Sequence, residues 1–130
     1  MGANTQIVQE IYAAFGEGRV GDIVARIADD ADFIHSGGET IPWSGNYKGP
    51  ARVAQFFADL AGAVNVTEFT PNQYVEAGET VVALGRWGGT ARATGKPFTS
   101  SWAMVWKLKD GKVSYYEAFE DSATIAKALC

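Results

Sequence analysis

The sequence predicts an α+β domain in which a strongly curved antiparallel sheet and about three to four helices enclose one apolar pocket. Apolar residues recur at helical spacing in the first half of the chain, and long extended runs joined by turns fill the second half. A chain of 130 residues, 47% of them hydrophobic, can bury one core without disulfide or metal support. Helices followed by an antiparallel meander favour a sheet with helices on one face. We therefore expect one domain over residues 1–130.

Two helices are expected at the start of the chain. The first covers residues 5–15, with Asn4 or Thr5 as its N-cap, and is ended by glycines. The second is short, starts at Ile23 and ends at the acidic pair at positions 29 and 30. Both carry an apolar face that needs a partner in the core.

A strand, an irregular loop and a third helix follow. The strand is predicted at residues 31–36, and the loop at 37–49 contains several glycines and a proline. Pro50 suits the first turn of the third helix, which Gly62 ends. A short helix over residues 122–129, with Ser122 as a possible cap, closes the chain.

Four strands are expected between these helices, at residues 64–75, 81–92, 98–108 and 113–119. Their connectors are turn-like, and the Asp-Gly pair at positions 110 and 111 is a strong hairpin signal, so each strand should pair with its neighbour. Gly85, Gly88 and Gly89 fall inside one strand, where glycine usually marks a bulge or a sharp bend. The sheet is therefore expected to curl.

Composition excludes several classes of function. No apolar run is long enough to span a bilayer, and the first residues lack the pattern of a signal peptide, so we expect a soluble, cytoplasmic protein. Net charge is −4 and the basic residues are scattered, which argues against nucleic acid as a partner. A single cysteine, Cys130, and a single histidine give no metal site, and no glycine-rich phosphate loop or serine–histidine–acid pattern is present. We expect no cofactor.

Four stretches of the sequence carry a resemblance to a known family. They are the phrases GDI and ADDA within residues 21–31, GNYKG at 45–49, TARATGKPF at 90–98 and VWKLKDGKV at 105–113. Together they resemble the SnoaL-like branch of the nuclear transport factor two-like superfamily, which includes ketosteroid isomerases, limonene epoxide hydrolases and polyketide cyclases. The resemblance implies a cone-shaped domain whose open end admits a small apolar or aromatic ligand, and a homodimer formed through the outer face of the sheet. This fold hosts many chemistries and also proteins with none.

The chemistries of these relatives can be compared with the residues at the matching positions. Aligned on the ADDA phrase, the position of the ketosteroid isomerase base corresponds to His35. The position of its donor aspartic acid corresponds to Met104, which cannot donate a hydrogen bond, and its tyrosine is matched by Tyr12. The carboxylates of limonene epoxide hydrolases correspond to Trp87 and Ala118. Steroid isomerisation and epoxide hydrolysis by those mechanisms are therefore not expected.

Three candidate catalytic residues remain, His35, Glu120 and Tyr12. An unperturbed pKa of about 6.5 suits the imidazole of His35 to proton abstraction near neutral pH, although a lone histidine is often a hydrogen-bonded wall residue. Glu120 shares a strand face with Tyr116, and the resemblance turns this face toward the cavity, where burial would raise its pKa. The alternative is a solvated carboxylate at the end of the strand. Tyr12 or Tyr116 would donate a hydrogen bond to a ligand oxygen.

Bulky residues from several elements are candidates for binding a flat apolar ligand, although aromatic stripes in strands are more often plain core. The candidates are Phe15, Trp43, Phe57, Trp87, Trp102, Met104 and Tyr116. We expect Phe15, Phe57 and Trp102 to line one cavity. The favoured function is a pocket protein for a small hydrophobic molecule, acting as a cofactor-free isomerase, cyclase or hydratase with His35 as the base. The alternative is a non-catalytic ligand-binding or dimerisation domain, and apolar residues on the outer sheet face, such as Val105 and Tyr115, favour a homodimer.

Overall fold

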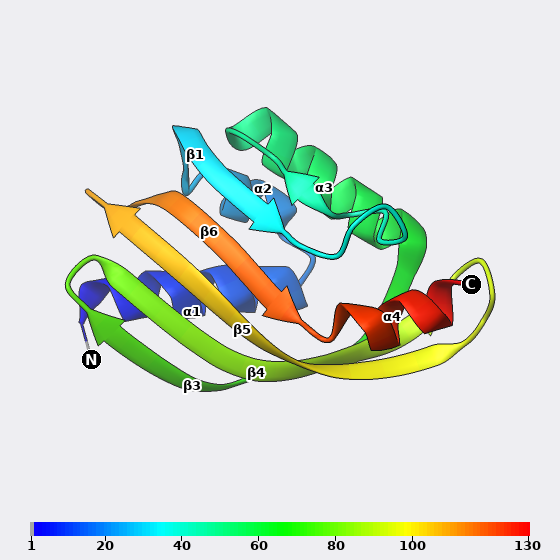
Figure 1. Cartoon of the computed structure of the whole chain (residues 1–130). Helices are drawn as coiled ribbons and strands as arrows, with labels where there is room; N and C mark the ends of the chain where they lie inside the picture. The colour runs from blue at the N-terminus through cyan, green and yellow to red at the C-terminus, as the bar shows by residue number, and fades with distance from the viewer. Residues whose placement is uncertain (1) are drawn as a thin grey trace.

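The computed structural model describes residues 2–130, which form four helices and one six-stranded sheet (Figure 1). The helices are α1 (Ala3–Gly16), α2 (Val20–Val24), α3 (Pro50–Ala63) and α4 (Ser122–Leu129). The strands are β1 (Ile27–His35), β2 (Gly45–Asn46), β3 (Val64–Ala77), β4 (Thr80–Ala91), β5 (Pro97–Lys109) and β6 (Lys112–Glu120). Their order in the sheet is β2-β1-β6-β5-β4-β3. The α+β prediction and the four-stranded meander β3 to β6 are confirmed.

The sheet is mixed, because β1 pairs with β6 in parallel. The expectation of a wholly antiparallel sheet is wrong at this pairing. Turn signals predict only which consecutive strands pair, whereas a parallel pair needs a long crossover connection. Here that connection is the chain from α3 through β5, which brings β6 back beside β1. The pairing places Phe33 opposite Tyr116 and His35 opposite Ala118.

Two bulges interrupt the pairing of β3 with β4 and bend this part of the sheet. The register shifts between Val66 and Glu68 and again between Pro71 and Gln73, so the extra residues lie in β3. The glycines of β4, which the sequence predicts at a bulge or a sharp bend, lie across from these bulges and allow close packing. A Cβ on Gly85 would come within 2.3 Å of the Trp102 ring. The long strands therefore wrap over the core as a curved wall (Figure 1).

Several element boundaries and caps differ from the sequence-based expectation. β1 starts at Ile27, so the acidic pair at 29 and 30 lies within a strand, at an irregularity between the β6 pairings of Ile27 and Asp32. The N-cap of α1 is Gly2, and Thr5 instead donates from both its amide and its hydroxyl to Glu76 on β3. The N-cap of α4 is Asp121, whose carboxylate accepts from the Thr124 amide. Ser122 is the first residue inside that helix.

The helices cover the concave side of the sheet. α1 packs against β3 and β4, α3 packs against β1 and β3, and α4 lies at the end of the sheet against β5 (Figure 1). The core between the helices and the strands is a continuous cluster of buried aliphatic and aromatic side chains. No helix within residues 2–130 is long and apolar enough to cross a membrane.

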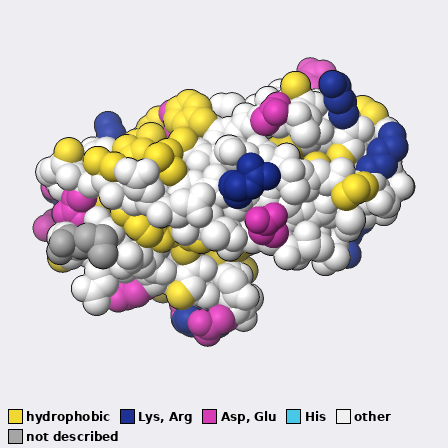
Figure 2. Space-filling model, turned by 90° about the horizontal axis from the view of Figure 1, so that it is seen from below, with side chains coloured by type: hydrophobic (Ala, Val, Ile, Leu, Met, Phe, Trp, Pro, Cys, Tyr) yellow, Lys and Arg dark blue, Asp and Glu magenta, His cyan; other side chains and the backbone are white. Residues whose placement is uncertain are grey.

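The opposite, convex face of the sheet carries exposed apolar residues. Leu84, Ala103 and Phe119 are direct neighbours across β4, β5 and β6, and Leu84 and Phe119 are 37% and 47% exposed. Val75 on β3 is 50% exposed. Figure 2 shows hydrophobic side chains gathered on one half of the face seen from below, with charged side chains scattered singly.

Candidate functional site

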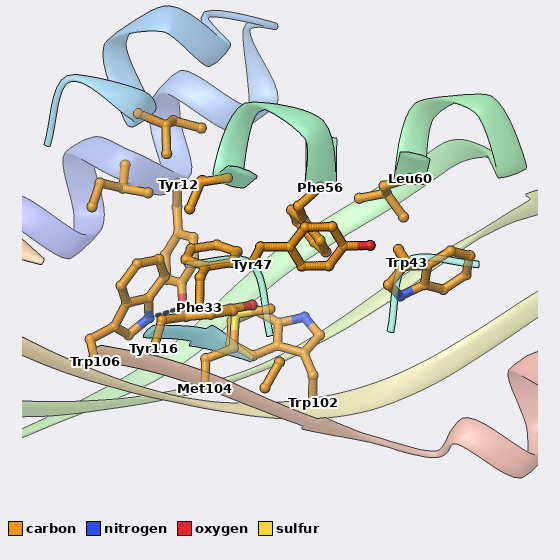
Figure 3. Packing of buried hydrophobic residues seen from close by; sticks show 14 of the residues in the cluster. Tyr12, Phe33, Trp43, Tyr47, Phe56, Leu60, Trp102, Met104, Trp106 and Tyr116 are labelled. Atoms are coloured by element: carbon orange, nitrogen blue, oxygen red, sulfur yellow. Dashed lines mark hydrogen bonds between the residues drawn. The ribbon is translucent and has the colours of Figure 1, made fainter. Parts of the chain in front are cut away.

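One cavity lies between the concave face of the sheet and helices α1 and α3. Its walls are almost wholly aromatic and aliphatic, and its acid–base groups are His35, Glu120 and two tyrosines. Nine of the ten residues proposed from the sequence line it together: Tyr12, Phe15, His35, Trp43, Phe57, Trp87, Met104, Tyr116 and Glu120. The distribution of the rings is visible in Figure 3, where Tyr12, Phe33, Trp106 and Tyr116 cluster at one end and Trp43 lies near Leu60 at the other.

Trp102 does not belong to the lining, contrary to the expectation. Its ring stacks on Phe69, with centroids 5.1 Å apart, and packs against Tyr12 at 5.5 Å, so it supports the wall from behind. Gly85, which lies beside the β3 bulge, has no side chain and leaves room for the ring in this position. Strand alternation correctly put Trp102 on the inner face but could not tell lining from support.

Three ring residues of the wall are not proposed from the sequence: Phe33, Phe56 and Phe69. Phe33 lies two residues before His35 on the same strand face, and Phe56 belongs to the apolar stripe of α3. Period-two and helical spacing could therefore have found both residues. Phe69 lies in β3 between two register shifts, where alternation no longer indicates the face.

His35 is buried at the end of β1 and makes one hydrogen bond through its ring. Its Nε2 lies 2.8 Å from the Tyr116 hydroxyl, and the ring stacks on Phe56 with centroids 4.4 Å apart. Burial lowers the pKa of His35 to about 3. The imidazole is therefore neutral at physiological pH. Within the described residues, its Nδ1 has no hydrogen-bond partner.

Glu120, the last residue of β6, brings a carboxyl group into the apolar cavity. Burial raises its pKa to about 7, and the indole N–H groups of Trp43 and Trp87 partly oppose this by favouring the charged form. Neither Glu120 Oε2 nor Trp87 Nε1 has an aligned hydrogen bond to any residue of the described chain. Oε2 is buried, which argues against the alternative of a solvated carboxylate.

Tyr12 on α1 is held by two residues of β5. Its hydroxyl accepts a hydrogen bond from Trp106 Nε1 at 2.9 Å and donates to Met104 Sδ at 3.2 Å. Burial raises the pKa of Tyr12, so it stays a phenol. A thioether is a weak acceptor, and the Tyr12 proton is therefore available to a better acceptor in the cavity.

The cavity is small in this conformation. Its volume is about 50 Å³, enough for only a few water molecules, whereas pockets for drug-sized ligands hold roughly 300–1,000 Å³. A flat aromatic ligand would have to displace rings of the wall. Among residues 2–130, no three His, Cys, Asp or Glu side chains are grouped to hold a metal ion.

A curved sheet, helices over its concave side and an apolar cavity with a few polar groups define the class of nuclear transport factor two-like domains. A family model described as a SnoaL-like domain matches residues 8–116. The chain therefore belongs to the SnoaL-like family. No match is found among curated proteins.

Solved structures with the same fold cover nearly the whole chain. An NTF2-like protein from Burkholderia thailandensis is 30% identical, with a TM-score of 0.90 over 100% of this chain and 99% of that one. An NTF2-like protein of unknown function from Burkholderia pseudomallei is 26% identical, with a TM-score of 0.91 over 99% and 98%. TerC, co-crystallised with polyporic acid, is 22% identical, with a TM-score of 0.87 over 97% of each chain.

Proposed function

We propose that the protein is a cofactor-free enzyme of the isomerase, cyclase or hydratase type, which moves a proton on a small apolar or aromatic molecule. The observation that carries the proposal is the buried carboxyl group of Glu120, whose pKa of about 7 leaves both protonation states populated near neutral pH. A base with a pKa near the working pH is the best compromise for accepting a proton and returning it.

Glu120 suits the role of base better than His35. The carboxylate would take a proton from a carbon next to a ligand carbonyl, and the C–H electron pair would form an enolate with its charge on oxygen. Glu120, now a carboxylic acid, would return the proton to another carbon. His35, with a pKa of about 3, is too weak a base near pH 7.

The rest of the cavity supports a neutral ligand with one polar end. Its wall offers aromatic faces for an apolar body, and hydrogen-bond donors such as Tyr12 and Trp87 could stabilise a developing oxyanion. Polyporic acid, the ligand of the TerC crystals, is an example of a small molecule held by a protein of this fold. The volume of about 50 Å³ favours a compact ligand or requires the wall to open.

Hydrogen–deuterium exchange tests the proposal without knowledge of the natural substrate. Cyclohexanone and acetophenone carry exchangeable protons beside a carbonyl, and their exchange in D₂O can be followed by proton NMR. The protein should accelerate exchange of at least one of them, and Glu120→Gln should lower this rate by roughly a hundredfold or more. Glu117→Gln is the matched control, because Glu117 lies on the same strand but bonds the Tyr115 hydroxyl.

The outcomes separate catalysis from binding. Equal exchange in the parent chain and the Glu120 variant would remove Glu120 from the chemistry. Binding of the ketones without exchange would favour the alternative, a non-catalytic ligand-binding domain.

A further inference from the structure

We propose that His35 serves the site as a neutral hydrogen-bond donor through Nδ1–H, with Tyr116 fixing this tautomer, and that its partner is an oxygen atom of the ligand. This inference rests on the proposed function for the identity of the ligand, a small molecule with a carbonyl or hydroxyl oxygen. It assigns His35 the opposite role to that of a base.

The tautomer follows from counting partners in a closed site. If Tyr116 donates its hydroxyl proton to Nε2, the imidazole proton lies on Nδ1, and only that N–H lacks a partner. If Nε2–H donates to Tyr116 instead, both the Tyr116 proton and the Nδ1 lone pair lack partners. Each buried unpaired polar group costs free energy, so the first arrangement is the more stable one.

The surroundings keep this histidine neutral and its ring fixed. Phe56 from α3 stacks on the ring at 4.4 Å, and the neighbouring Phe33 stacks on Tyr116 at 4.0 Å. The titratable groups that share the cavity are Tyr116 and Glu120 from β6 and Tyr12 from α1. None is a cation, and burial raises the pKa of all three, so both tyrosines stay neutral and Glu120, with a pKa of about 7, is partly protonated near pH 7. A neutral imidazole is therefore the expected form over the physiological range.

An unpaired buried donor points to a ligand acceptor. His35 lines the cavity, and Nδ1 is its one ring nitrogen without a partner among residues 2–130. Glu120 Oε2 and Trp87 Nε1 line the same cavity and make no aligned hydrogen bond within the described residues. These groups together call for a ligand with an acceptor oxygen beside a group that can give a proton to Glu120. A hydroxy or carbonyl compound with an apolar body has this pattern, and a hydrocarbon does not.

The first experiment reads the tautomer directly. His35 is the only histidine, so the ring signals of a ¹⁵N-histidine-labelled sample belong to it alone. We expect a protonated, pyrrole-type Nδ1 and a pyridine-type Nε2, unchanged on titration through pH 6.5. Tyr116→Phe should abolish this preference, whereas Tyr115→Phe, the neighbouring hydroxyl paired with Glu117, should leave it unchanged. A protonated Nε2 in the parent chain, or a titration near 6.5, would overturn the proposal.

The second experiment tests the partner and uses phenol and benzene as a matched pair of probes. Donation from His35 predicts that phenol binds more tightly than benzene, and that His35→Phe lowers this preference by about tenfold. Glu120→Gln keeps an oxygen that can accept from the phenol hydroxyl, so this variant should retain most of the preference. A failure of the base assignment is therefore distinguishable from a failure of this one. Equal affinities for the two probes, including the absence of binding by both, would contradict the assignment. Circular dichroism on each variant checks that it folds.

Discussion

His35 and Glu120 have opposite pKa shifts for one physical reason, the cost of burying a charge. The pKa of His35 falls from 6.5 to about 3, so between these pH values the unfolded chain binds a proton that the folded chain does not. Stability from this residue is lost as the pH falls through that range. The pKa of Glu120 rises from 4.5 to about 7, so the folded chain keeps a proton that the unfolded chain releases. Stability from that residue is lost as the pH rises through its range.

Between about pH 5 and pH 6.5, His35 makes the free energy of unfolding rise with pH and Glu120 makes it fall. Glu120→Gln separates these two contributions. With the carboxyl group removed, the free energy of unfolding should rise with pH by roughly 1 kcal/mol per unit across this window, because only His35 contributes. Above about pH 8, the variant should exceed the parent chain in stability by up to about 3 kcal/mol. Urea unfolding at several pH values measures both the dependence of the unfolding free energy on pH and the difference between the variant and the parent chain. A variant whose stability follows the parent at every pH would show that Glu120 is not buried as a charge.

His35→Gln should give the opposite slope in the same window. Without the imidazole, the free energy of unfolding should fall as the pH rises from about 5 to 6.5, by roughly 1 kcal/mol per unit, because Glu120 acts alone. The same urea titrations provide the measurement, and Glu39→Gln, at an exposed loop position, is the control. A flat profile in the variant would contradict the pKa assigned to Glu120.

At the scale of the elements, the curved pair β3 and β4 depends on glycine where Trp102 packs. A Cβ on Gly85 would lie 2.3 Å from the Trp102 ring and 2.5 Å from the Thr70 carbonyl oxygen. Gly85→Ala should therefore cost about 2 kcal/mol or more, by displacing the ring or the strand. In contrast, Gly62→Ala in α3 meets no atom within 4 Å and should be neutral or stabilising. Thermal unfolding compares the stabilities of the two variants. Equal midpoint temperatures would contradict the predicted difference.

The start of α1 depends on a residue 71 positions away. Glu76 on β3 accepts hydrogen bonds from the Thr5 amide at 2.8 Å and the Thr5 hydroxyl, in place of a local cap. Thr5→Val removes the buried hydroxyl and should cost about 1 kcal/mol. Glu76→Ala should also lower the free energy of unfolding, and the double variant should lose less than the sum of the two. Glu79→Ala, at the adjacent turn, is the control. Additive losses would show that the two residues are not coupled.

At the scale of the whole molecule, the convex face of the sheet remains the expected site of self-association. Leu84 and Phe119, about 37% and 47% exposed, flank Ala103 in one row across three strands. A homodimer would cover this row, because water-exposed apolar patches are costly. Sedimentation should find a dimer at micromolar concentration, and Leu84→Lys with Phe119→Lys should convert it to a monomer. Thr40→Lys is the control. A monomer in the parent chain would refute the expectation.

Local sequence patterns are sufficient to predict the kinds of elements and the faces of most strands. Apolar spacing predicted α1 and α3, turn residues predicted the meander from β3 to β6, and alternation put Tyr116 and Glu120 on one face. These features follow from local periodicity and turn chemistry, which neighbouring residues specify. Much of the cavity lining is therefore predictable, except that Trp102 is wrongly included and Phe69, between two register shifts, is missed.

Which distant groups meet, and how they are charged, depends on the folded arrangement of the chain. The parallel pairing of β1 with β6 brings His35 within 2.8 Å of Tyr116, although the two are 81 residues apart. Burial makes His35 neutral, whereas its ordinary pKa of about 6.5 indicates a base. Burial likewise raises the pKa of Glu120 toward neutrality. Protonation depends on desolvation and on partners in space, and neither is set by spacing along the chain.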